Sequence, residues 1–264
     1  MNGLRSYLKD HVVVADGAMG TMLQAYKFTE VDFRGDRFTD HPCSLQGNND
    51  MLSLTQPEAI KTIHRKYFEV GADIVETNTF SSTSIGMGDY EMEPWVYELN
   101  FESAKLAREV ADEFTHANPN KPRFVAGSIG PTNRTASMSP DVNDPGYRAV
   151  TFDDLVISYS EQVQGLVDGG SDVLLVETVF DTLNAKAALF AIDALKEKNN
   201  WDIPVMVSGT ITDASGRTLS GQTVEAFVIS VSHIPLLSIG FNCALGADQL
   251  LPYLRTLSQV TEVR

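Results

Sequence analysis

Short apolar runs alternate with amphipathic stretches along almost the whole chain. Six of these runs predict buried strands, at 12–15, 73–80, 123–127, 173–178, 204–209 and 236–241. Between them apolar residues recur at helical spacing, as in the series Leu155, Tyr159, Val163 and Leu166. Regular alternation of apolar strands with amphipathic helices predicts a parallel sheet.

Polar residues follow the predicted strands, which favours a closed barrel over a dinucleotide-binding sheet. Asp16 follows the first run, Glu177 stands near the end of the fourth, and Asn242-Cys243 ends the sixth. The glycine fingerprint of dinucleotide-binding folds does not occur. We therefore expect a (β/α)8 TIM barrel of which only the first six βα units are present, forming one domain over 1–264 that is incomplete at its C-terminus.

Two local patterns add detail to this fold. The long connection 28–54 carries Phe28, Phe33 and Phe38, which predict an ordered lid rather than a disordered loop. The sequence Thr55-Gln-Pro-Glu58 predicts a capping box that begins the next helix. Cys43, within the long connection, is interpreted as a packing residue.

Composition and charge narrow the function classes. The 264 residues are 43% hydrophobic, and 20 basic against 35 acidic residues give a net charge of −15. Nucleic acid and anionic membranes attract basic surfaces, so neither is an expected partner. Two cysteines suit a reducing compartment, and the N-terminus lacks a signal peptide, which together predict a cytoplasmic protein.

The barrel would bring chemically useful groups to one mouth. Carboxylates at Asp16 and Glu177 could hold an ammonium group, the backbone at Gly17 a carboxylate, and the thiol of Cys243 a soft metal. This set suits an amino acid substrate that ends in sulfur. Purely structural roles remain open, with Asp16 capping a turn and Glu177 pairing with a basic side chain. The five histidines show no metal spacing, and no nucleophile elbow occurs.

Six stretches closely resemble the N-terminal homocysteine-binding module of the cobalamin-dependent methionine synthases. They lie at Asp16–Thr21, Gly71–Phe80, Gly130–Thr135, Ser139–Pro145, Glu177–Asn184 and Gly209–Gly221. The resemblance covers essentially the whole chain. The loops at 130–145 and 209–221 are more similar to the cobalamin-dependent enzymes than to their betaine-dependent relatives.

This resemblance implies a reaction and a set of site residues. Homocysteine would bind at the barrel mouth, its thiol on zinc (Zn²⁺) held by three cysteine thiolates. It would take the methyl group of methylcobalamin, carried by a module outside this chain, to form methionine, and a folate module would restore the methyl group. Cys243 would be the first zinc ligand. Asp16, Gly17, Thr79 and Glu177 would line the homocysteine site, and no residue is assigned a catalytic role.

One departure from the family qualifies the expected activity. The Gly-Gly-Cys-Cys motif that supplies the other two zinc ligands does not occur, so the zinc site is incomplete. We therefore expect this piece alone to bind zinc weakly and not to turn over. Two alternatives stay open, a homocysteine S-methyltransferase with another methyl donor and a non-catalytic barrel fragment. A phosphate-dependent isomerase or aldolase is disfavoured because no lysine ends a predicted strand.

Overall fold

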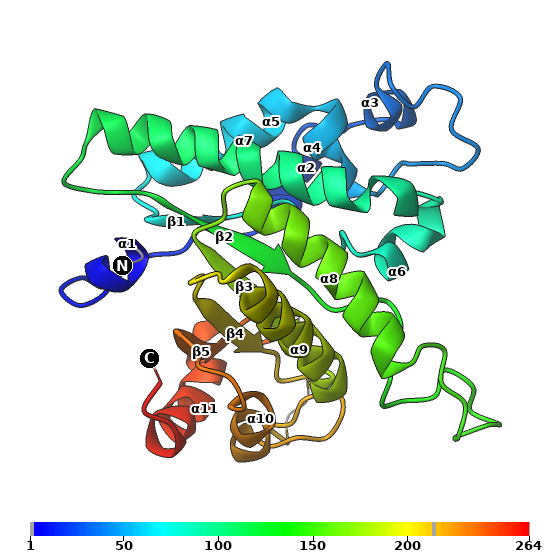
Figure 1. The fold of residues 1–264 in the computed structure, drawn as a ribbon, viewed down its shortest axis with the longest axis vertical. Helices are drawn as coiled ribbons and strands as arrows, with labels where there is room; N and C mark the ends of the chain where they lie inside the picture. The colour runs from blue at the N-terminus through cyan, green and yellow to red at the C-terminus, as the bar shows by residue number, and fades with distance from the viewer. Residues whose placement is uncertain (1–2, 213–214, 264) are drawn as a thin grey trace. The chain divides into compact units, whose positions relative to one another are not determined.

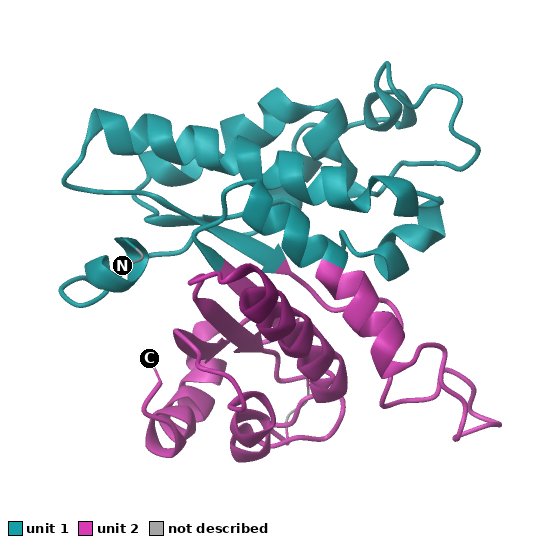
Figure 2. Cartoon of the chain, in the orientation of Figure 1, with its two compact units in different colours: residues 1–128, 161–173 teal, residues 129–160, 174–264 magenta. Residues whose placement is uncertain are grey.

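The chain divides into two compact units in the computed structural model, which describes residues 3–212 and 215–263. Unit 1 comprises residues 1–128 and 161–173, and unit 2 comprises 129–160 and 174–264 (Figure 2). Asp213 and Ala214, within the 209–221 motif, lie outside the described residues, as do Met1, Asn2 and Arg264. The single domain predicted over 1–264 stays a prediction.

Unit 1 combines a parallel strand pair with several helices (Figure 1). Strand β1 (Ile74–Glu76) pairs in parallel with β2 (Phe124–Ile129), which ends at the unit boundary. The remaining elements are α1 (Gly3–Tyr7), α2 (Met19–Gln24), α3 (Glu30–Arg34), η1 (Asn49–Met51), α4 (Leu52–Thr55), α5 (Pro57–Glu69), α6 (Ser84–Met87), η2 (Gly88–Tyr90), η3 (Glu93–Trp95) and α7 (Val96–Ala117). Helix α5 packs against α7, and buried residues of both contribute to the core.

The first predicted strand is reduced to a single bridge. Ala15 pairs in parallel with Ile74, while the backbone N–H of Val14 donates to the Asp73 side chain at 2.9 Å. Val12 is 94% exposed, so this stretch has no buried face to extend the pairing. The described residues therefore contain five named strands, and the predicted count of six units is not confirmed.

The predicted capping box is wrong. Thr55 is the last residue of α4, and its hydroxyl contacts the Met51 carbonyl at 3.5 Å. Helix α5 begins at Pro57 after Gln56, which makes no side-chain cap. Proline suits the first helical position because its missing N–H and fixed φ cost nothing there. The Thr-x-x-Glu pattern therefore spans the end of one helix and the start of another.

Unit 2 contains three parallel strands and most of the later helices (Figure 1). Its elements are β3 (Val173–Val179), α9 (Thr182–Asn199), β4 (Val205–Gly209), α10 (Val224–Val231), β5 (Ser238–Phe241) and α11 (Ala247–Val260). β4 pairs with β3 on one side and β5 on the other, with Leu174 beside Val205 and Met206 beside Ser238. The parallel α/β class predicted from the sequence is confirmed.

Helix α8 (Phe152–Asp168) crosses the unit boundary, its first part in unit 2 and its part from Glu161 in unit 1. The predicted inward series Leu155, Tyr159, Val163 and Leu166 is buried throughout, which confirms the helical interpretation of that pattern. Among the helices of residues 3–212 and 215–263, none combines the length and the apolar character needed to cross a membrane.

Candidate functional site

Asp16 and Gly17 lie directly after the bridge to β1. The Asp16 carboxylate accepts the Glu76 backbone N–H at 3.1 Å, and its own N–H donates to the Ile74 carbonyl at 2.9 Å. A Cβ on Gly17 would stand 3.2 Å from the Tyr67 hydroxyl, so a side chain there would crowd that ring. Asp16 therefore fastens this turn to β1, a structural role that the sequence left open beside substrate binding.

Thr79 lies in the interior of unit 1, just beyond the end of β1. Its side chain is fully buried, and its hydroxyl donates to the Ser128 carbonyl at 2.7 Å. The same oxygen lies 2.6 Å from the Thr77 hydroxyl, and the Thr79 carbonyl accepts from Gln162 at 2.8 Å. These contacts hold the end of β1 against the end of β2. That Thr79 lines a homocysteine site stays a prediction.

Glu177 and Cys243 belong to unit 2, at the ends of β3 and β5. Glu177 is 8% exposed, and its carboxylate accepts a long hydrogen bond of 3.4 Å from the Thr178 hydroxyl. Cys243 is exposed and follows β5 with a φ of +59°. Glu177 lies in the last part of β3 and Cys243 follows β5, close to the carboxyl ends of strands where parallel α/β proteins bind ligands.

Asn242 connects these two strand ends. Its side-chain oxygen accepts from the Thr178 backbone N–H at 3.1 Å and from the Ser208 hydroxyl at 2.7 Å. Its side-chain nitrogen donates to the Thr178 hydroxyl at 2.8 Å. In the sequence Asn242 stands out only as the neighbour of the thiol, and an amide at the end of a predicted strand was the available signal for its role.

The structure thus groups the predicted residues in two sets, Asp16, Gly17 and Thr79 in unit 1, and Glu177 and Cys243 in unit 2. No three His, Cys, Asp or Glu side chains among the described residues gather as a metal ion would require. A closed zinc site needs four ligands, and a single thiol at Cys243 does not satisfy it. The donor set of the described residues therefore does not fit a complete zinc site.

Two of the sequence motifs are joined by buried polar contacts in unit 2. Asp181 caps α9 by accepting the N–H groups of Leu183 and Asn184, and it also accepts the Ser137 hydroxyl at 2.5 Å. Asn184 accepts the Ala136 N–H at 2.9 Å and donates to the Thr132 hydroxyl at 3.0 Å. The loop after β2 is therefore fixed to the start of α9, which gives Thr132, Asp181 and Asn184 of these motifs a structural role.

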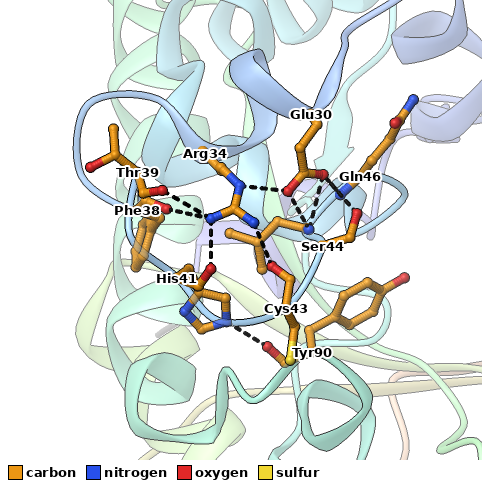
Figure 3. Close-up of polar contacts among 10 residues, drawn as sticks. Glu30, Arg34, Phe38, Thr39, His41, Cys43, Ser44, Gln46 and Tyr90 are labelled. Atoms are coloured by element: carbon orange, nitrogen blue, oxygen red, sulfur yellow. Dashed lines mark hydrogen bonds and ion pairs between the residues drawn. The ribbon is translucent and has the colours of Figure 1, made fainter.

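The predicted lid contains a hydrogen-bond network around two charged residues of α3, Glu30 and Arg34 (Figure 3). The Arg34 guanidinium donates to four backbone carbonyls, those of Phe38, Thr39, His41 and Cys43. Glu30 accepts from Arg34, from the Ser44 hydroxyl and from the N–H groups of Leu45 and Gln46. Although burial opposes the shift, these donors lower the Glu30 pKa to about 2.

Cys43 lies half-buried in the same loop. Its thiol donates to a carboxylate oxygen of Glu91 at 3.0 Å, and this hydrogen bond, together with burial, raises the Cys43 pKa. The thiol therefore stays protonated at neutral pH, and Cys43 acts as a hydrogen-bonding residue, whereas its packing role stays a prediction.

The parallel α/β architecture is shared with solved homocysteine methyltransferases. The chain is similar to the metallated form of MmuM from Escherichia coli, with 22% identity and a TM-score of 0.77 over 98% of this chain and 83% of that one. The oxidized form of the same protein is 22% identical, with a TM-score of 0.77 over 99% of this chain and 83% of that one. The apo form is also 22% identical, with a TM-score of 0.70 over 98% of this chain and 82% of that one. This likeness shows the fold, in agreement with the predicted barrel class.

The family follows from the sequence match. A family model described as homocysteine S-methyltransferase matches residues 13–264, nearly the whole chain. The chain therefore belongs to the homocysteine S-methyltransferase family, and it is a methyltransferase by that membership.

Proposed function

We propose that this chain binds homocysteine and prepares its thiol for methyl transfer from methylcobalamin, giving methionine. The family match over residues 13–264 supports homocysteine as the substrate. Methylcobalamin as donor, and cobalamin and folate modules as partners, rest on the resemblance of the loops at 130–145 and 209–221. In the reaction the homocysteine sulfur would lose its proton and form a bond to the methyl carbon. The cobalt–carbon bond of the donor would break, and its electron pair would stay on the cobalt, outside this chain.

The proposed roles follow the chemistry of each residue. In unit 2, the carboxylate of Glu177 would bind the ammonium group of homocysteine. In unit 1, Asp16, Gly17 and Thr79 are proposed as further homocysteine-binding residues, with the Asp16 carboxylate suited to an ammonium group and the backbone at Gly17 suited to a carboxylate. Cys243, exposed beyond β5, would contribute one thiolate ligand to zinc. Zinc, when bound, lowers the pKa of a coordinated thiol.

Homocysteine binding is the first test, because it needs no methyl donor. We expect calorimetry to detect binding to the wild-type chain. The substitution Glu177→Gln should weaken it about tenfold, the effect of losing one charged hydrogen bond. Asp193→Asn on α9 removes an exposed carboxylate and should leave the affinity unchanged. Equal affinity of wild type and Glu177→Gln would remove Glu177 from the site.

The methyl donor needs a separate measurement. Labelled methyl transfer to homocysteine should be compared with methylcobalamin and with betaine as donors, with the purified chain in excess over donor and with saturating zinc, because this piece is not expected to turn over and only a single transfer can be measured. Preference for methylcobalamin supports the proposal. Transfer from betaine alone would assign the chain to the homocysteine S-methyltransferases with another donor, and absence of homocysteine binding would favour a non-catalytic role.

A further inference from the structure

The side chain of Asn242, directly after β5, makes three hydrogen bonds to residues of β3 and β4 in unit 2. Two reach Thr178, beyond the middle of β3, and one reaches Ser208 on β4. Its backbone N–H also donates to the Gly209 carbonyl at 2.9 Å. A side-chain amide accepts through its oxygen and donates through its nitrogen at the same time. Asn242 therefore links β3, β4 and β5 at the end where the thiol follows.

The residues beside this link have unusual backbone conformations. Thr178 has a φ of +53°, Cys243 +59° and Ala244 +53°. Left-handed backbone is unfavourable for residues with a Cβ, and most of all for a β-branched threonine. Such conformations persist where surrounding contacts hold them. Asn242 supplies such contacts for Thr178, because it bonds both the N–H and the hydroxyl of that residue. Cys243 follows Asn242 directly in the chain, so these bonds also anchor the start of the turn that carries the thiol.

A polar chain leads from Asn242 to the acid. Asn242 donates to the Thr178 hydroxyl at 2.8 Å, and that hydroxyl donates to Glu177 at 3.4 Å. The thiol-bearing turn and the Glu177 carboxylate are thus connected through two side chains. We propose that Asn242 is a positioning residue that holds Cys243 and Glu177 in the arrangement that receives homocysteine. This inference rests on the proposed function for its ligand.

Substitutions of the Asn242 amide can distinguish its effect on the turn at Cys243 from its effect on Glu177. Aspartate at 242 keeps acceptors for the Thr178 N–H and the Ser208 hydroxyl, but it loses the donor to the Thr178 hydroxyl. Alanine loses all three bonds. We therefore expect Asn242→Asp to keep the turn at Cys243 while disturbing Glu177, and Asn242→Ala to release both.

Cysteine-selective ¹³C,¹⁵N labelling tests the turn directly, because the sequence contains only Cys43 and Cys243. Cys43 lies in unit 1 and serves as the internal reference. Wild type should show the Cα shift and N–H to Hα coupling of a left-handed residue at Cys243. Asn242→Ala should move the Cys243 signal toward unfolded values and leave Cys43 unchanged, whereas Asn242→Asp should leave both signals in place.

Homocysteine affinity, measured on the same proteins, tests the link to Glu177. Asn242→Asp and Asn242→Ala should each raise Kd about tenfold, the effect of one lost bond in a charged network. Thr178→Val removes the hydroxyl between Asn242 and Glu177, so it should raise the Kd for homocysteine and leave the Cys243 signal unchanged. If Asn242→Ala does not fold, this variant still tests the link to Glu177. Asn199→Asp places the same new charge at the exposed end of α9 and should change neither readout.

The outcomes distinguish this inference from the proposed function. An unchanged Cys243 signal in Asn242→Ala, or unchanged affinity in both Asn242→Asp and Thr178→Val, would overturn the positioning role even with homocysteine bound. Absence of homocysteine binding by the wild type would overturn the proposed function. In that case the Cys243 signal of Asn242→Ala still decides whether Asn242 holds the turn.

Discussion

The two thiols of the chain have opposite surroundings. Cys43 is half-buried and donates to Glu91, and the raised pKa keeps it protonated. Cys243 is exposed, in a left-handed turn beyond β5. The same residue type therefore serves stability at one position and stands accessible to ligands at the other.

This contrast predicts different reactivity, because the thiolate is the nucleophile and access limits its rate. At pH 7, iodoacetamide should alkylate Cys243 at least about tenfold faster than Cys43. Peptide mass spectrometry over a time course measures both rates in one sample. Glu91→Gln should speed the reaction of Cys43 and leave that of Cys243 unchanged. Faster alkylation of Cys43 in the wild type would contradict the observed hydrogen bond.

His64 predicts a pH dependence of stability. It is fully buried in α5, neither ring nitrogen has a hydrogen-bond partner among the described residues, and burial lowers its pKa from 6.5 to about 4. Below pH 6.5, His64 binds a proton in the unfolded chain but stays neutral in the folded chain. The free energy of unfolding therefore falls as the pH drops from 6.5 toward 4. The full effect is about 3 kcal/mol.

Urea unfolding of wild type and His64→Leu between pH 7 and 4 measures this contribution. The free energy of unfolding of the variant should lose the decline over that window, while both proteins share the remaining acid dependence. Parallel curves for the two proteins would show that His64 is protonated in the folded state.

At the scale of elements, α8 approaches α7 at backbone distance within unit 1. A Cβ on Gly165 would lie 2.7 Å from the Tyr97 carbonyl oxygen and 2.9 Å from the Asn100 Cβ. Both neighbours belong to helix α7. The glycine at 165 is therefore required by packing rather than by a special backbone angle.

Gly165→Ala should destabilise the protein by about 1–3 kcal/mol, the usual cost of overpacking, despite the better helix propensity of alanine. Thermal unfolding provides the measurement. Gly20→Ala, in α2, is the matched control, because the added Cβ would come no nearer than 4.0 Å to the Asn49 side-chain nitrogen. A Gly165→Ala protein as stable as wild type would show that α7 and α8 separate without cost.

The hydrogen-bond network around Glu30 and Arg34 predicts that the 35–46 loop loses stability in acid. Since the Glu30 pKa falls from 4.5 to about 2, its hydrogen bonds stabilise the loop above pH 4.5 and are lost as pH falls toward 2. Amide exchange at Leu45 and Gln46, corrected for intrinsic rates, should accelerate over this window. Glu30→Gln should show fast exchange already at pH 5, whereas Glu69→Gln, exposed at the end of α5, should match wild type.

Local patterns predicted some elements and missed others for physical reasons. The α8 series is buried because helical spacing alone determines which residues share a face. The run at 12–15 has strand composition but forms one bridge, because pairing depends on a partner edge and the Asp73 side chain takes the Val14 N–H. Thr55 was misplaced because a four-residue pattern does not distinguish the end of α4 from the start of α5.

The candidate site shows the same division. Glu177 and Cys243 could be selected because they stand where apolar runs end. The role of Asn242 depends on bonds to Thr178, 64 residues away in sequence, which no local pattern contains. The burial of Thr79 arises likewise from Ser128 and Gln162 on other elements.

At the scale of the whole molecule, the donor inventory predicts weak zinc binding. The chain has two cysteines, and the Cys43 thiol is bonded to Glu91. After dialysis against a chelator and then micromolar zinc, we expect well under one zinc per chain by atomic absorption. Cys243→Ser should remove most of what remains, and Cys43→Ser should not. One tightly held zinc per chain would contradict this prediction.

Unit 1 is built from two separated pieces of sequence, and this has a consequence during synthesis. Residues 161–173 supply Gln162 to the Thr79 carbonyl and Asp172 to the Val125 N–H. A growing chain that has left the ribosome only as far as residue 128 lacks both partners. Unit 1 therefore reaches its full set of contacts only after the 129–160 segment of unit 2 has also emerged, so translation order ties the maturation of one unit to the appearance of the other.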